Sequence, residues 1–364
     1  MRKFSENYLR DLQIRRGLQM FGSANIGADG PLNVITNNTV GVNDMSPEMK
    51  TFYKTELLQF AEPELLFERF GKKVPIPQHN GNSVEIRYMD PLPVVTTNLT
   101  EGVTPAGNYV NFRAITESLR QIGYWVGYSD KLQWETVDPV IAEITKAEGR
   151  QAGKSIDTLI RDVVSAGTNV MYAPNYSAGA YTENTAASTM NGTALMTVDL
   201  LLQAAAILQG QDAPTIDGEF VAIMHPYVAC DLKKTKEWQD LQRYVHPEKI
   251  YRGEIGSVGN IRVIENTRAK IWNDSTHRGA QTSTSGTYYS CYATMVLGAD
   301  AYAVSELEGA GLEHVVKPLG AGDDPLNQRG SVGWKAMRLA KILIQQYMVR
   351  IETTSATMPT ASPN

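Results

Sequence analysis

Hydrophobic and polar residues follow two different periods along this chain of 364 residues. In the first pattern, apolar side chains recur at the spacing of one helix face and stop at Gly167. Asp138 and Pro139 stand before it, where an N-capping carboxylate and a proline suit the start of a helix. The pattern therefore predicts a helix over 138–166, on the order of 40 Å long at 1.5 Å per residue.

A period of two replaces the helical one from Ser83 onward. Val84, Ile86 and Tyr88 alternate with the residues of a second face, which is typical of a strand. A proline- and glycine-rich excursion follows, and strand-like composition then returns in "YVNFRAITESLRQIGYWVGYSD". We therefore predict an extended hairpin over 81–128. Because it has few core residues of its own, it should need a partner surface.

The other segments mix helices with strands, which favours an α+β fold. Further elements are expected as helices over 1–20, 197–210 and 227–245, a helix start at Ser46 and Pro47, and strands over 220–226, 261–266 and 288–307. The stretch 330–354 has strand composition and should rejoin the first region, because the long helix needs a sheet to cover it. Polar composition predicts a surface loop over 174–193 and a frayed tail after Ser355.

Composition limits the classes of protein to which this chain can belong. With 42% hydrophobic and 20% charged residues it is an ordinary globular chain, and its net charge of −5 argues against a surface that binds nucleic acid throughout. Cys230 and Cys291 are too few and too far apart for a disulfide framework, which favours folding in the cytosol. No apolar run reaches the roughly 18 residues of a membrane-spanning helix, and no signal peptide is evident.

The first sixteen residues depart from the acidic balance of the chain. Their five basic residues face only Glu6 and Asp11, which leaves a local excess of three positive charges. The basic residues are Arg2, Lys3, Arg10, Arg15 and Arg16. Such an arm is either a solvated helix end or a surface for an anionic partner.

The stretch "EGRQAGKSID" is similar to a phosphate-binding loop because glycines precede Lys154 and Ser155. Such a loop follows a strand and needs four residues between its glycines, whereas only three residues separate Gly149 from Gly153. The stretch also lies inside the predicted helix, where backbone N–H groups already bond to carbonyls. We conclude that it is not a phosphate-binding loop. The four-residue spacing of the glycines instead predicts a helix face against which another element packs closely.

No other motif makes a convincing active site or metal site. Gly253, Gly256 and Gly259 lead into a strand, so they indicate a turn rather than a dinucleotide-binding loop. None of the five histidines stands at a metal-ligand spacing, and His225 is expected to be structural. The aspartate pair before Pro325 is expected to form a solvated turn. The chain is thus predicted to be no enzyme and to need no cofactor or metal.

Aromatic and basic residues gather on the second arm of the predicted hairpin. On a projecting arm, large aromatic rings and arginines are typical of contacts with another chain. The candidate intersubunit residues are Arg113, Arg120, Tyr124, Trp125 and Tyr128.

As an ordered set, five segments resemble the major capsid proteins of tailed bacteriophages, in particular the N4-like major capsid family. The segments are "LLFERFGKKVPIPQHNGNSVEIRYMDPLP" (65–93), "LTEGVTP" (99–105), "DPVIAEITKAEGRQAGKSIDTLIRDVVSAGTNVMYA" (138–173), "GEIGSVGNIRVIEN" (253–266) and "GSVGWKAM" (330–337). The resemblance covers about residues 60 to 352, whereas 1–60 and 174–193 match poorly.

This resemblance implies the HK97-like capsid fold, which has an N-terminal arm, an extended β-hairpin loop, a peripheral domain with a long spine helix, and an axial domain. It divides the chain into an arm and helix at 1–80, the extended loop at 81–128, the peripheral domain at 129–194 with the spine helix at 138–166, the axial domain at 195–324, and a return to the peripheral domain with a C-terminal tail at 325–364.

The implied function is self-assembly into the icosahedral head of a tailed double-stranded DNA phage, in the host cytoplasm. The implied partners are other copies of the chain in hexamers and pentamers, portal, scaffolding and decoration proteins, and DNA bound without sequence specificity, with no membrane. On the inner surface, the basic arm would lie near DNA phosphates or pair with acidic patches on neighbours. We expect a non-covalent shell, no long fused scaffold and no proteolytic removal of the arm.

Two alternatives remain open at this point. An encapsulin-like nanocompartment shares the fold but encloses enzyme cargo, and gene neighbours would separate it from a phage head. A nucleotide-dependent soluble enzyme would rest on 149–155 and 253–259, and nucleotide binding that is lost in Lys154→Ala would support it.

Overall fold

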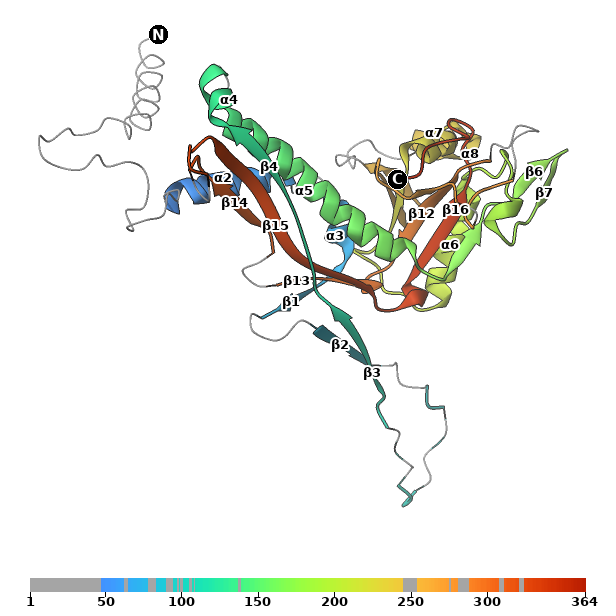
Figure 1. Ribbon diagram of the computed structural model, residues 1–364. Helices are drawn as coiled ribbons and strands as arrows, with labels where there is room; N and C mark the ends of the chain where they lie inside the picture. The colour runs from blue at the N-terminus through green and yellow to red at the C-terminus, as the bar shows by residue number, and fades with distance from the viewer. Residues whose placement is uncertain are drawn as a thin grey trace, which may run out of the picture.

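The computed structural model describes most of the chain from Pro47 onward. The described residues are 47–61, 65–77, 83–89, 94–96, 98, 101–104, 107, 109–136, 139–244, 254–274, 276–280, 288–307, 311–320 and 324–364. They form an elongated body in which one long helix, α5 (Val140–Ser165), runs from a sheet at one end to a second sheet at the other (Figure 1). A two-stranded hairpin projects away from this body.

Three helices begin at a side chain that accepts a free N–H group of the first turn, whereas α3 and α5 begin without such a cap. The hydroxyls of Ser129 and Thr197 do so for α4 and α6, and the His225 ring does so for α7. The helix expected over 227–245 is split in two, because Thr235 between α7 and α8 has extended backbone. Besides α5, the helices are α2 (Pro47–Ala61), α3 (Leu66–Phe70), α4 (Asp130–Glu135), α6 (Val198–Gly210), α7 (Pro226–Lys234) and α8 (Lys236–Tyr244), with 3-10 turns η3 (Ala187–Thr189) and η5 (Gln345–Tyr347).

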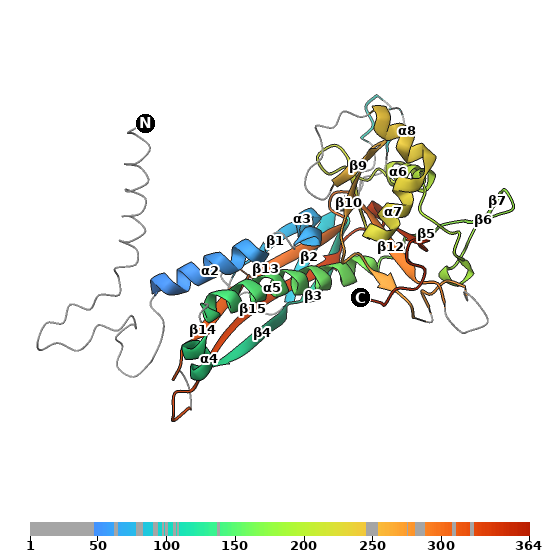
Figure 2. The ribbon, with the colours of Figure 1, turned by 90° about the horizontal axis from the view of Figure 1, so that it is seen from above.

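A five-stranded sheet forms one end of the body. Its strands are β1 (Lys72–Ile76), β4 (Arg120–Ser129), β13 (Tyr302–Leu307), β14 (Glu313–Lys317) and β15 (Arg329–Ile342). The long strand β15 is central, since β4 pairs along one of its edges while β14 and β13 share the other. The helices α2 and α5 lie side by side over this sheet (Figure 2). The Trp334 indole N–H donates to Gln151 of α5 at 2.6 Å, which marks the covered face.

Helix α5 joins the two sheets through one hydrophobic core. Ile156 and Ile160 of α5 pack in a cluster with Trp334 of the five-stranded sheet and with Ile223 and Leu297 of the other sheet. The long apolar stripe in the sequence therefore becomes the face that holds both halves together. The observed helix corresponds to the one expected over 138–166, and Asp138 lies outside the described residues.

Gly149 lets α2 cross close to α5, as the glycine spacing predicted. A Cβ added there would lie 2.8 Å from the Leu57 carbonyl oxygen and 2.9 Å from Phe60 Cβ. Gly149→Ala should therefore lower the free energy of unfolding by about 1–3 kcal/mol, because backbone must move. Gly210→Ala is the matched control, since Gly210 ends α6 in open space. Chemical denaturation measures both, and equal stabilities of the two variants would contradict the close crossing.

The second sheet has seven strands and its own core. Its strands are β5 (Val170–Tyr172), β8 (Phe220–Met224), β9 (Glu254–Val258), β10 (Ile261–Glu265), β11 (Ile271–Trp272), β12 (Cys291–Leu297) and β16 (Met348–Thr353). They run in the order β5-β16-β12-β8-β10-β9, with β11 beside β12. Helices α6, α7 and α8 contribute Leu201, Leu232 and Trp238 to the core on this sheet.

Strand pairing differs from the expected division of the chain in two places. Strands β13 and β14, at 302–317, lie in the expected axial stretch but pair with β15 in the five-stranded sheet. Strand β16 lies in the stretch expected to return to the peripheral domain but pairs with β12 and β5 in the seven-stranded sheet. A buried strand has the same apolar composition in either sheet, so the pattern of residues could not assign it.

The projecting hairpin is shorter than the 81–128 predicted from the sequence. Its paired arms are β2 (Ser83–Met89) and β3 (Phe112–Ser118), which match residue by residue from Ser83 with Ser118 to Met89 with Phe112. The next strand, β4, leaves the hairpin and pairs with β15 instead. All seven residues of β2 are already paired with β3, so β2 offers β4 no partner. The edge of β15 that is not paired with β13 or β14 is long enough to pair with all ten residues of β4.

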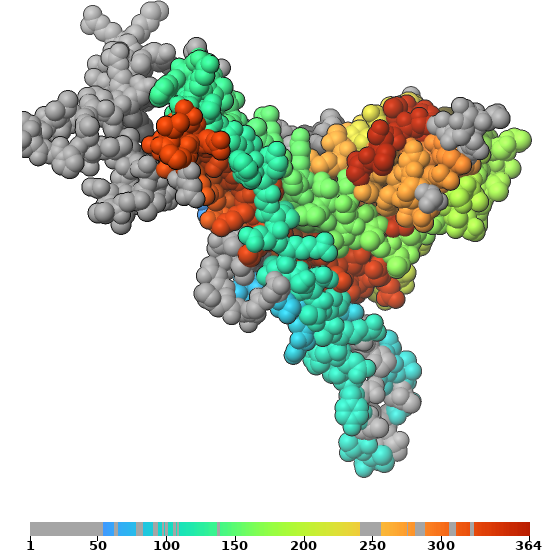
Figure 3. All heavy atoms as spheres, in the orientation of Figure 1, coloured from blue at the N-terminus to red at the C-terminus, as the bar shows by residue number. Residues whose placement is uncertain are grey.

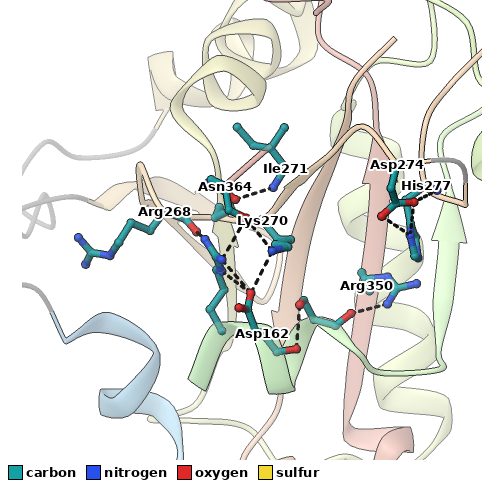
Figure 4. A network of polar contacts seen from close by, with 11 residues as sticks. Asp162, Arg268, Lys270, Ile271, Asp274, His277, Arg350 and Asn364 are labelled. Carbon is teal, nitrogen blue, oxygen red and sulfur yellow. Dashed lines mark hydrogen bonds and ion pairs between the residues drawn. The ribbon is translucent and has the colours of Figure 1, made fainter. Parts of the chain in front are cut away.

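The C-terminal tail is packed on the body, and the expectation that it frays after Ser355 is wrong. The buried carboxylate of Asp231 accepts the hydroxyls of Ser355 and Thr357, each at 2.6 Å. The main-chain oxygen of Asn364 accepts from Lys270 Nζ at 2.6 Å, within the polar network that Figure 4 shows. Polar composition suggested a loose tail, but these side chains are hydrogen-bond partners for buried groups.

The surface loop expected over 174–193 contains a second small hairpin. Its strands are β6 (Asn175–Ser177) and β7 (Ala180–Thr182), and they project at the far end of the body from α4 (Figure 1). The Asn175 amide holds the base of this hairpin by donating to Asn184 Oδ1 and to the Thr189 carbonyl.

Candidate assembly surfaces

The hairpin β2–β3 and the excursion at its end carry apolar side chains that the subunit does not bury. In the space-filling view this part stands clear of the body (Figure 3). Its exposed large apolar residues are Met89, Val94, Val95, Val103, Tyr109, Val110 and Phe112. The root is fixed, because Ile86 packs with Ala303 and Leu343 of the body. The hairpin is thus a firmly rooted arm with an apolar end.

Two of the predicted contact residues, Tyr124 and Trp125, lie exposed on β4. Their exposed fractions are 53% and 70%. Because neighbouring residues of a strand face opposite ways, the two rings serve different surfaces. Tyr124 pairs in register with Trp334 and faces the side of α5, whereas Trp125 pairs with Gly333 and faces the open side of the sheet. The structure does not bring them into one cluster.

Tyr128 belongs to the core of the subunit. It is 5% exposed and packs with Val316 and Val332. Gly330 is its register partner, and a Cβ on Gly330 would clash with the Tyr128 ring. The interpretation of all three aromatics as residues of a projecting arm is corrected, because β4 is part of the five-stranded sheet. Of the two arginines, Arg113 lies exposed on β3 and Arg120 lies exposed at the start of β4.

The open face of the five-stranded sheet has an apolar and basic surface around Trp125. Trp125 lines two surface grooves that share Lys317 and Ser331, and Val315 lines one of them. The Trp125 side chain can lie close to β15 because its register partner is a glycine: a Cβ on Gly333 would lie 2.9 Å from Trp125 Cβ. Exposed Leu132 of α4 continues the apolar surface, since it lines the same groove as Trp125. Leu132 was missed in the sequence because a six-residue helix gives no readable pattern.

A buried acid, Glu148, lies between α5 and the sheet. It is 2% exposed, and among the described residues neither of its carboxylate oxygens has a hydrogen-bond partner of acceptable geometry. Burial raises the pKa of Glu148 to about 7, and the Val126 N–H offsets this only in part. Burial also lowers the pKa of His314 on β14 to about 4. Sequence pattern gave no sign of Glu148, because a glutamate is expected on the solvent side of a helix.

The motifs set aside in the sequence have structural roles where the structure describes them. Lys154 and Ser155 lie in the middle of α5, and Gly259 forms the turn between β9 and β10 with φ of +58°. His225 caps α7, and the Asp324 carboxylate accepts three backbone N–H groups of its own turn. Among the described residues, no three His, Cys, Asp or Glu side chains are grouped to hold a metal.

The five basic residues of the arm, Arg2, Lys3, Arg10, Arg15 and Arg16, lie outside the described residues. Ser46 lies outside them too, whereas the helix it was expected to start is α2. In the part of the chain that the structure describes, no helix is long and apolar enough to cross a membrane.

Comparison with known protein families shows to which family the chain belongs. A family model described as phage capsid protein matches residues 106–350, more than half of the chain. The chain belongs to the phage capsid protein family. No curated protein sequence matches it. The match begins inside the hairpin excursion and takes in β4, α5 and the strands of both sheets apart from β1 and the end of β16.

Solved phage capsids share the fold of this capsid protein. The capsid of cyanophage P-SCSP1u aligns with a TM-score of 0.56 at 12% identity, covering 80% of this chain and 89% of that chain. The capsid of Ralstonia phage GP4 gives a TM-score of 0.56 at 15% identity, covering 80% and 88%. Cyanophage Pam1 gives 0.55 at 12%, covering 77% and 86%. The α+β, HK97-like fold is therefore confirmed, and the chain is a structural protein of the virion that associates with itself.

Proposed function

We propose that this protein is the major capsid protein of a tailed double-stranded DNA phage and forms an icosahedral shell of hexamers and pentamers. Its N4-like character, its assembly in the host cytoplasm and the absence of any enzymatic activity are parts of the same proposal. The domain names follow it: β2–β3 with its excursion is the extended loop, the five-stranded sheet with α5 is the peripheral domain, and the seven-stranded sheet is the axial domain.

The observation that carries the proposal is the exposed apolar end of the rooted hairpin. Fully burying a Val or Phe side chain contributes about 1.5–3 kcal/mol, so leaving seven large apolar residues in water is costly for a lone subunit. The packing of Ile86 against Ala303 and Leu343 holds the base of the arm on the body, while the apolar residues at its end stay exposed. A neighbouring copy can cover them, and an arm that overlaps its neighbour adds a second contact to each subunit pair.

The intersubunit roles of Arg113, Arg120, Tyr124 and Trp125 are part of this proposal. Exposed Tyr, Trp and Arg side chains are enriched where proteins meet. Tyr124 and Trp125 would then mark two different contacts, one on each face of β4, and Tyr128 would support them from inside the subunit. Portal, scaffolding and decoration proteins are proposed as further partners of the shell.

Sedimentation of the expressed chain, with negative-stain imaging of the same fractions, tests the proposed function. Closed shells of megadalton mass are expected when the chain is made with the other head proteins of its phage. A chain that stays near 40 kDa under those conditions would count against a shell protein.

The basic arm is proposed to lie on the inner side of the shell near packaged DNA. Neutralising Arg2, Lys3, Arg10, Arg15 and Arg16 to glutamine should lower the salt concentration at which DNA leaves opened shells, because each phosphate contact adds about 0.9 to the salt slope. Opened particles titrated with sodium chloride measure this. Replacing the same number of exposed lysines elsewhere controls for net charge, and unchanged release would remove the arm from the DNA contacts.

A further inference from the structure

A small cavity lies where the hairpin joins the body, at the passage from β3 to β4 (Figure 1). Its volume is about 230 Å³, far more than the roughly 15 Å³ that a single water molecule requires. The C-terminal half of α5 forms an apolar wall with Leu159, Ile160 and Val163, and the end of β15 lines the cavity as well. The cavity therefore has room for a small ligand.

Two arginines lie opposite each other in the strand pair that lines this cavity. Arg120 of β4 and Arg338 of β15 are register partners, and residues directly opposite in an antiparallel pair lie on the same face of the sheet. Both line the cavity, but Arg338 is only 9% exposed, whereas Arg120 is exposed and lies at the mouth. Like charges in such a pair destabilise a sheet. An anion that contacts both arginines would remove this repulsion.

The carboxylates of the subunit neutralise these cations only in part. Arg338 pairs with Glu68 at 2.7 Å, and Lys341, which also lines the cavity, pairs with Glu117 at 2.6 Å. No ion pair is found for Arg120 among the described residues, and Glu117 attracts it only at longer range. Among the described side chains, three cations thus meet two carboxylates, and Arg120 carries the surplus positive charge.

A phosphate group fits this arrangement better than a carboxylate does. It carries up to two negative charges, and its oxygens point in several directions, so one group can accept hydrogen bonds from donors on two strands. The Ser118 hydroxyl lines the cavity as a further donor. The position between α5 and the sheet suits a free phosphate ion or a small phosphomonoester, whereas a DNA duplex cannot enter a space of 230 Å³.

We propose that this cavity binds the phosphate group of a small ligand, either inorganic phosphate or a phosphomonoester, with Arg120 at the mouth and Arg338 on the inner side. The bound group joins β4 to β15 at the point where the hairpin leaves the body, and it offsets the repulsion between the two arginines. The site lies within one subunit, so it goes beyond the proposed shell function and is tested without shells. A contact of Arg120 with a neighbouring copy would compete with the ligand.

Calorimetric titration of the full chain with sodium phosphate, at fixed ionic strength, tests the site. One phosphate per subunit should bind with a Kd of about 1 mM or tighter. Arg120→Met should weaken binding at least about tenfold, because the surplus charge and its forked donors are both lost, and Arg120→Lys should weaken it about threefold. Arg87→Met is the matched control and should bind like wild type, since Arg87 pairs with Glu85 at 2.7 Å on β2, outside the cavity. Circular dichroism checks that each chain is folded.

Phosphorus NMR supplies a second readout, because the phosphate signal should broaden with wild type and not with Arg120→Met. Glycerol phosphate distinguishes the two sources: its binding assigns the site to phosphomonoesters as well, and its exclusion restricts the site to inorganic phosphate. Three results would overturn the proposal: equal affinity of wild type and Arg120→Met, acetate that binds as tightly as phosphate, or a DNA duplex that displaces phosphate at equal phosphate concentration. A wild-type chain that forms no shells contradicts the proposed function and leaves this site standing.

Discussion

Replacing Glu148 with methionine is expected to stabilise the subunit by about 3 kcal/mol at pH 8 and by much less at pH 4. Methionine has a similar length and no polar atom to desolvate, so it should fit between α5 and the sheet. The wild-type carboxylate is 2% exposed and lacks a hydrogen-bond partner of acceptable geometry in the described part of the chain. Ionising it inside the folded subunit is therefore costly.

The sign of the pH effect follows from the raised pKa. The folded pKa of Glu148 is about 7, above its ordinary value of 4.5, so between these values the folded state holds a proton that the unfolded state has lost. Stability from this group is therefore present below pH 4.5, falls as the pH rises, and is lost above about pH 7. The difference of about 2.5 pKa units, at 1.36 kcal/mol each, gives the expected 3 kcal/mol.

Urea denaturation of wild type and variant between pH 4 and pH 9 measures this difference. Glu143→Gln is the matched control on the same helix, because Glu143 is exposed and pairs with Lys146 at 3.0 Å. It should change stability by less than about 1 kcal/mol at every pH. Parallel curves for wild type and Glu148→Met would show that the carboxylate does not titrate in the folded subunit.

The sequence was most informative where local pattern and final structure depend on the same residues. The apolar stripe that ends at Gly167 became α5, and the helix expected from Thr197 is α6, with Thr197 as its N-cap. The spacing of Gly149 and Gly153 pointed correctly to a close crossing at Gly149. In each case the cause lies within a few residues, so no knowledge of distant partners was needed.

The sequence pattern could not predict which segments pair when they lie far apart along the chain. Strand β4 fits the hairpin and the sheet equally well by composition, and only the free length of β15 decides between them. The same holds for β16, and for the tail, whose polar residues satisfy Asp231 and Lys270. Of the contact residues predicted from the sequence, Trp125 is exposed on β4, whereas Tyr128, three positions further on, lies in the core of the subunit. Alternation along a strand sorts its residues into two faces, but it does not tell which face is buried until the packing of the sheet is known.

The buried polar residues show a second limit. Glu148, Arg350 and Glu352 would each be assigned to the surface by type, yet the structure buries all three. Arg350 and Glu352 form an ion pair with each other, whereas Glu148 has no such partner among the described residues. Substitutions of the pair and of Glu148 are therefore expected to change stability in opposite directions. Removing the lone acid should help the subunit, whereas removing one member of the pair should harm it.

Replacing Arg350 with methionine is expected to lower the free energy of unfolding by about 3–5 kcal/mol. Its guanidinium forms an ion pair with Glu352 at 2.8 Å, and the Glu352 side chain is fully buried. It also donates to the carbonyls of Ser165 and Gly167, where α5 ends, and lies 5.1 Å from the Trp272 ring centroid. One side chain thus ties the end of α5 to the seven-stranded sheet, and its loss leaves a buried carboxylate and two carbonyls without their donor.

The double variant Arg350→Met, Glu352→Met separates the cost of the stranded charge from the loss of packing. It should be more stable than Arg350→Met alone, because no uncompensated charge remains in the core. Lys341→Met is the surface control, since Lys341 pairs with Glu117 at 2.6 Å but is 41% exposed, and it should cost at most about 1 kcal/mol. Guanidinium denaturation of the four chains measures these differences. If Arg350→Met costs no more than Lys341→Met, the buried pair does not hold α5 to the seven-stranded sheet, and the joint must rest on the apolar contacts of Ile156 and Ile160 alone.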